Sequence, residues 1–114
     1  MPFYICKKNM NWIYLILAGV FEIGWPLGLK LSQTMTSKFL GIAIAIVCMT
    51  ISGALLWLAQ KTIPIGTAYA IWTGIGAIGT LLIGILFFSD SASIWRLLSA
   101  SLIVIGIVGL KLAH

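Results

Sequence analysis

The chain is poor in charged residues, histidine and cysteine. Only 8% of its 114 residues are charged, and 61% are hydrophobic. A soluble domain of this size leaves much of its surface in water, so the composition indicates an integral membrane protein with one domain. With one histidine and two cysteines, the chain lacks the residues for a disulfide framework, a metal cluster or a nucleophile–histidine pair. We therefore expect no enzyme activity, no cofactor and no metal.

Basic residues outnumber acidic ones, and the formal net charge is +5. Nucleic-acid binding needs basic residues gathered on one surface. Here they lie at the ends of apolar runs, where long basic side chains reach the lipid headgroups. The distribution thus excludes a nucleic-acid partner and indicates the lipid bilayer. The basic residues are Lys7, Lys8, Lys30, Lys38, Lys61, Arg96 and Lys111.

Four apolar segments follow one another between short polar breaks. Each is long enough, at about 1.5 Å per residue, to cross a hydrocarbon core of about 30 Å as a helix. The sequence therefore predicts an all-α protein with four transmembrane helices in one domain, residues 10–114, preceded by a poorly ordered or optional extension, residues 1–9. We expect the helices near residues 12–31, 39–59, 64–88 and 94–112.

Two of the polar breaks contain residues that are typical of helix starts. Pro64 suits the first turn of the third helix, where its missing N–H is not needed. Asp90, Ser91 and Ser93 precede the fourth helix and are residue types that cap helix N-termini. We therefore interpret Asp90 as a capping residue rather than as part of a binding site.

Glu22 is the only acidic residue inside any of the apolar segments. A carboxylate at bilayer depth costs about 2.5–3.5 kcal/mol on insertion scales, and such residues face a protein interior or a water-filled cavity. Gly19 and Trp25 lie three residues to either side and share its helical face. We expect Gly19 to leave room beside the carboxylate and Trp25 to offer an indole N–H. Pro26 removes the backbone hydrogen bond to the carbonyl of Glu22.

Aromatic residues of the third segment complete the candidate site. Tyr69, Trp72 and Gly76 share one face, and an aromatic ring attracts a cation. Ser52 on the second segment adds a hydroxyl. The run from Gly74 to Gly79 matches G-x-G-x-x-G, but it has no preceding strand and lies within an apolar helix. It therefore does not indicate a dinucleotide cofactor.

A buried carboxylate flanked by aromatic rings is suited to a monovalent organic cation. The same carboxylate binds a proton, so proton and cation would exclude each other at Glu22. With access alternating between the two sides of the membrane, this competition produces proton-coupled antiport. The residues thus predict a transporter whose substrate is a small organic cation.

The basic residues are balanced across the membrane. The side that carries both termini has four, and the other side has three; without residues 1–9 the count is two against three. Orientation follows a clear excess of Lys and Arg on one side, so we expect dual topology and an antiparallel homodimer with inverted symmetry. The second half of the fourth segment offers small residues for close helix contact, Gly106 and Gly109, with Ala100 one to two turns earlier.

Three segments together resemble the small multidrug resistance family, and most closely its guanidinium-exporter subtype. They read NWIYLILAGVFEIGWPLGLK, PIGTAYAIWTGIGAIG and LIVIGIVGLKL, and the resemblance spans about residues 10–113. It implies an antiparallel, dual-topology homodimer with one shared substrate site, and its fourth helices would form the main dimer contact. It also implies that the site residues are Glu22, Trp25, Ser52, Tyr69, Trp72 and Gly19. We expect a multi-pass protein of the bacterial plasma (inner) membrane.

The stretch GWPLG departs from the pattern of the guanidinium subtype, which usually has a bulkier residue before the tryptophan and alanine after it. We expect Gly24 and Pro26 to widen or reshape the pocket. An exporter of quaternary ammonium compounds is therefore the alternative within transport. A non-transporting membrane subunit is the alternative from another class, and a heterodimer with a paralogous chain stays open beside the homodimer.

Overall fold

The computed structural model describes the backbone of residues 2–34 and 37–113, and the side chains from residue 10 onward within these ranges. The described residues form four helices, all of them long and apolar enough to cross a membrane, which confirms the predicted all-α, four-span fold. The helices are α1 (Pro2–Thr34), α2 (Lys38–Ala59), α3 (Ile65–Phe87) and α4 (Ile94–Ala113).

Helix α1 begins at Pro2, well before the expected start near residue 12. No glycine or proline occurs between Pro2 and Gly19, so nothing in the sequence interrupts the helix, and proline is well tolerated at a helix start. The backbone of the extension thus continues α1, and the candidate membrane span within it runs from Met10 to Thr34. The side chains of residues 1–9, including Lys7 and Lys8, lie outside the described residues.

The two expected helix starts differ in detail from the structure. Pro64 is the N-cap residue of α3 rather than part of its first turn, and its carbonyl accepts the Ala68 N–H at 2.9 Å. Ser93 caps α4, because its Oγ accepts the Arg96 N–H at 3.4 Å. Capping by Asp90 is wrong: its own N–H donates to the carbonyl of Gly84 and so closes the end of α3.

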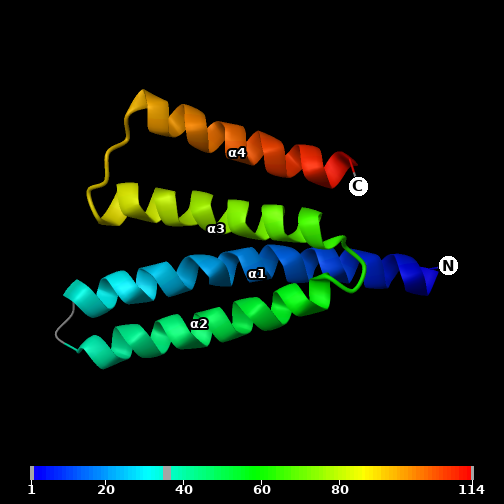
Figure 1. The fold of residues 1–114 in the computed structure, drawn as a ribbon, viewed down its shortest axis with the longest axis horizontal. Helices are drawn as coiled ribbons and strands as arrows, with labels where there is room; N and C mark the ends of the chain where they lie inside the picture. The colour runs from blue at the N-terminus through cyan, green and yellow to red at the C-terminus, as the bar shows by residue number, and fades with distance from the viewer. Residues whose placement is uncertain (1, 35–36, 114) are drawn as a thin grey trace.

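Helix α1 lies between α2 and α3, and α4 packs on the far side of α3 (Figure 1). The helices run alternately up and down. The start of α1, the α2–α3 connection and the end of α4 therefore lie at one end of the bundle, and the other two connections lie at the opposite end (Figure 1).

Glycines set how closely the helices approach. A Cβ on Gly28 would lie 2.8 Å from backbone atoms of Gly41 and Ala45, so α1 and α2 touch through their backbones. On the other face of α1, Gly79 of α3 receives the side chain of Ile23. Small residues allow this close approach, because larger side chains would hold the two backbones apart.

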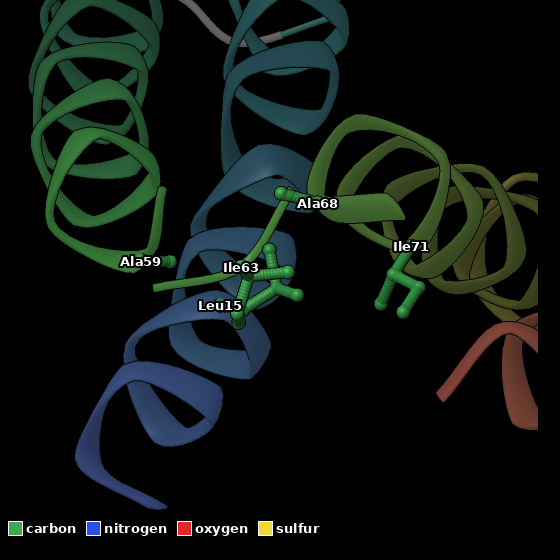
Figure 2. Packing of buried hydrophobic residues seen from close by; sticks show 5 residues of the cluster. All are labelled: Leu15, Ala59, Ile63, Ala68 and Ile71. Atoms are coloured by element: carbon green, nitrogen blue, oxygen red, sulfur yellow. The ribbon is translucent and has the colours of Figure 1, made fainter. Parts of the chain in front are cut away.

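A small apolar cluster closes the end of the bundle at the α2–α3 connection. Its residues come from α1, from the end of α2, from the connection itself and from α3 (Figure 2). Ile63 of the connection is 1% exposed and packs with Leu15. Glu22 lies about two helical turns further along α1, so the cluster anchors one side of the candidate site. Its residues are Leu15, Ala59, Ile63, Ala68 and Ile71.

Helix α4 buries none of its residues within the single chain. A Cβ added at Gly106 or Gly109 would meet no atom within 4 Å of it. Ala100 is partly buried. The face that the sequence analysis assigned to dimer contact is therefore unoccupied in one chain, and the antiparallel, dual-topology homodimer stays a prediction.

Candidate functional site

The carboxylate of Glu22 is held by donors from two helices. The indole Nε1–H of Trp25 donates to Oε1 at 2.7 Å, as the three-residue spacing on α1 predicted. Ser52 of α2 places its Oγ 3.3 Å from Oε2. Each oxygen thus has a neighbouring donor, and each retains a further lone pair for a ligand.

Ser52 joins all three helices that surround the carboxylate. Its side chain is fully buried, its Oγ lies 2.7 Å from the Ala18 carbonyl oxygen, and it accepts the indole N–H of Trp72 at 2.8 Å. A hydroxyl has one proton to donate. Ser52 therefore serves either the carbonyl of α1 or the carboxylate of Glu22, while Trp72 fixes the position of its oxygen.

Gly76, rather than the expected Gly19, makes room for the glutamate. A Cβ on Gly76 would lie 2.6 Å from Cγ of Glu22, so Gly76 of α3 provides the room for the glutamate side chain. A Cβ on Gly19 would lie 2.7 Å from side-chain atoms of Ile75, so Gly19 receives an isoleucine and leaves no space beside the carboxylate. Helical spacing showed that Gly19 and Glu22 share one face of α1. It did not show which helix would cover each of them.

A pocket of about 460 Å³ opens beside Glu22. Pro26 lines it, as expected for a residue that shapes the site. Gly24 is not among the lining residues and instead lies against α2, where a Cβ on it would be 2.5 Å from Sγ of Cys48; its effect on the pocket stays a prediction. The pocket runs from α1 and α3 to the start of α4 and is lined by Glu22, Pro26, Thr73, Gly76, Ala77, Thr80, Leu81, Asp90 and Arg96.

Tyr69 lies apart from this pocket in the single chain. It is 56% exposed, and its ring packs against that of Trp72 with centroids 5.5 Å apart and planes inclined by 59°. Trp72 in turn reaches the carboxylate only through Ser52. The structure thus joins Trp25, Ser52 and Trp72 to Glu22, while a direct contact of Tyr69 with substrate stays a prediction.

The sequence analysis missed three polar residues that line the pocket: Thr80, Asp90 and Arg96. For Thr80 a signal existed, because it lies four residues after Gly76 and seven after Thr73 on one face of α3. For the other two no signal existed, since the α3–α4 connection determines where they lie. Among the described residues, no group of three or more His, Cys, Asp or Glu residues is placed to hold a metal ion.

The arrangement is chemically suited to a cation. A single carboxylate, oriented by neutral donors and bordered by an open pocket, supplies one negative charge within an otherwise apolar bundle. An inorganic metal ion would need several more oxygen or nitrogen ligands. An organic cation needs only the charge, hydrogen-bond acceptors and room.

Comparison with known proteins gives a consistent result along nearly the whole chain. Residues 10–103 match the family described as Small Multidrug Resistance protein. The guanidinium exporter of Proteus vulgaris is 53% identical over 104 residues, which are 91% of this chain and 99% of that protein. The guanidinium exporter of Salmonella typhimurium strain LT2 is 54% identical over 104 residues, again 91% of this chain and 98% of the other.

Replacing Ser52 by alanine is expected to destabilise the bundle by about 1–3 kcal/mol, because Trp72 Nε1–H and the Ala18 carbonyl lose a buried partner together. Unfolding in mixed detergent micelles, followed by circular dichroism, measures the effect. Thr50→Val is the matched control, since it removes an exposed hydroxyl of the same helix that bonds only its own backbone. Equal stability of the two variants would contradict the network.

Proposed function

Because the chain belongs to the small multidrug resistance family, we propose that it exports guanidinium-like cations in exchange for protons, with Glu22 as the group that binds both. Membership of this family makes the chain a membrane transporter rather than an enzyme. Its four spans and its bacterial relatives place it in the bacterial inner membrane as a multi-pass protein.

The observation that supports this function is the orientation of the Glu22 carboxylate beside the pocket. Trp25 and Ser52 orient its two oxygens, and the pocket leaves their outer lone pairs accessible. Guanidinium is planar and presents a fork of N–H donors, which matches a carboxylate in two parallel hydrogen bonds. A fixed carboxylate loses little further freedom when it receives such a ligand.

Proton coupling follows from the scarcity of charge. Glu22 is the only acidic residue within the spans, so a proton and a cation that both need a carboxylate must take turns there. Exchange of one for the other, with the site opening first to one side and then to the other, moves the cation outward as protons move inward.

The proposed unit is an antiparallel homodimer. One chain has an anchored end, with the Leu15–Ile63 cluster, and an end toward which the pocket extends. A second copy inserted the other way up would present these ends in reverse, which supplies the inverted symmetry of alternating access. Helix α4, which buries none of its residues in one chain, offers the surface through which the two copies would contact each other.

Export of quaternary ammonium compounds is the second candidate. The pocket of about 460 Å³ and the position of Pro26 in its wall favour substrates larger than guanidinium. Such ions carry no N–H donors and would depend on charge and aromatic attraction. The non-transporting membrane subunit that the sequence left open disagrees with membership of a transporter family.

Guanidinium is expected to be taken up by proteoliposomes of the wild-type chain when their interior is more acidic than the medium. Glu22→Gln should reduce this uptake by about tenfold or more, since a hydrogen bond to a charged group is lost. Tetramethylammonium measured alongside distinguishes the substrate classes. Uptake of the quaternary ion alone would contradict the guanidinium proposal. Undiminished uptake in a folded, dimeric Glu22→Gln protein would exclude the role of the carboxylate.

Lower pH is expected to weaken the apparent affinity for guanidinium, because protons then occupy Glu22. For one competing proton the change approaches about tenfold per pH unit once the site is largely protonated. Titration of the binding isotherm at several pH values measures it in the detergent-solubilised dimer. A pH-independent affinity would contradict competition at one carboxylate.

Reporters fused to the C-terminus are expected to appear on both sides of the membrane, because neither side carries a clear excess of basic residues. An alkaline phosphatase fusion and a green fluorescent protein fusion, measured in the same cells, report the two orientations. Adding two lysines at one end should shift the ratio. A single orientation in the unmodified chain would rule out dual topology.

A further inference from the structure

The pocket beside Glu22 has a second acidic residue at its other end. Asp90 and Arg96 line the same pocket of about 460 Å³ that begins at Glu22. Asp90 lies in the connection between α3 and α4, outside both spans, and Arg96 lies in the first turn of α4. A cation leaving Glu22 along this pocket therefore meets one further carboxylate before it leaves the protein.

The α3–α4 connection holds Asp90 in place. The N–H groups of Phe88 and Asp90 both donate to the carbonyl of Gly84 at 3.0 Å, and Ser89 between them has a φ of 60°. Gly84 has no side chain, and a Cβ there would overlap the Asp90 carboxylate. The carboxylate thus lies against the last turns of α3, where the backbone determines its position.

Arg96 is a loosely bound partner for this carboxylate. Its Nη2 lies 4.0 Å from Oδ2 of Asp90, the side chains are 39% and 49% exposed, and among the described residues its buried Nε has no hydrogen-bond partner. The first turn of a helix also disfavours a positive charge. An exposed, single-contact pair of this kind contributes little, so another cation with better geometry can replace it.

The side chain of Arg96 carries the same chemical group as the proposed substrate. We propose that Asp90 is an outer cation-binding position on the route to Glu22, at which free guanidinium takes the place of the Arg96 side chain. Free guanidinium, unlike the tethered group, is able to align both N–H donors with the carboxylate. Each exchange replaces one positive charge by another at Asp90.

Lys30 brings a second positive charge to the region of this outer position. It lines a neighbouring pocket of about 270 Å³ together with Pro26 and Asp90. With Arg96 displaced but still nearby, two basic side chains would lie in the region of one carboxylate. A cation is therefore held for a short time and released readily, which is what a position on a transport route requires.

The inference rests on the proposed function, but it is measured by a separate signal. Arg96 is the only arginine in the chain, so protein labelled with ¹⁵N-arginine gives one Nε–H resonance in lipid bicelles. Titration with guanidinium chloride should shift this resonance saturably in the wild type and in Glu22→Gln. Tetramethylammonium chloride at equal ionic strength screens the pair without replacing Arg96, so its shift should be smaller and should not saturate.

The variant Asp90→Asn should reduce the guanidinium shift to that of tetramethylammonium. Equal shifts by both salts in the wild type would overturn the proposal. So would a guanidinium shift that persists in Asp90→Asn and disappears in Glu22→Gln, because the resonance would then report binding at Glu22. The substitution keeps the side-chain size and the backbone hydrogen bond to Gly84, so the connection retains its structure.

Transport gives the second measurement. Asp90→Asn should raise the apparent KM for guanidinium by roughly three- to tenfold, as expected for loss of a weak charged contact, while the maximal rate changes little. Asp90→Glu, which keeps the carboxylate, should recover part of the difference. An unchanged KM in Asp90→Asn beside normal wild-type uptake would refute the outer position alone. The absence of any proton-coupled guanidinium uptake by the wild type would instead refute the proposed function.

Discussion

The structure depends on the need to accommodate one carboxylate inside an apolar bundle. In the described part of the chain, the groups that donate to Glu22 are neutral: the indole of Trp25 and the hydroxyl of Ser52. Ser52 belongs to α2 and also accepts a hydrogen bond from Trp72 of α3. The hydrogen bonds around Glu22 of α1 therefore join three helices at one level of the bundle. Each unsatisfied polar group at this depth would be costly, which explains why these side chains bond to one another.

Small residues make this network possible. Ser52 reaches Glu22 only if α1 and α2 lie close together, and backbone contact at Gly28 allows this. On the other side, Gly76 leaves the space in which the glutamate side chain lies. The glycines therefore allow the short distances between the helices, and at these distances the polar side chains reach one another.

The two ends of the helix bundle differ in a way that suits a transporter. At the α2–α3 connection, the apolar cluster is reinforced by a buried hydrogen bond in which Asn11 Nδ2 donates to Thr62 Oγ1 at 2.6 Å. Toward the α3–α4 connection, the pocket leads from Glu22 to an exposed ion pair. One end is packed, and the other has an open pocket and an ion pair. A second copy in the opposite orientation would place one end of each kind on both sides of the membrane.

The sequence by itself determined the class of protein, the four spans and the position of the single acidic residue within them, because these follow from hydropathy along the chain. It also identified Trp25, since residues three apart on one helix are neighbours in any fold. Only the tertiary structure decided that Gly76, rather than Gly19, makes room for the carboxylate, that Cys48 occupies the space at Gly24, and that Asp90 faces the pocket instead of capping α4. Helical periodicity states which residues share a face. Contacts between residues distant in the sequence decide which helix covers that face. They also decide where the side chains of a connection lie.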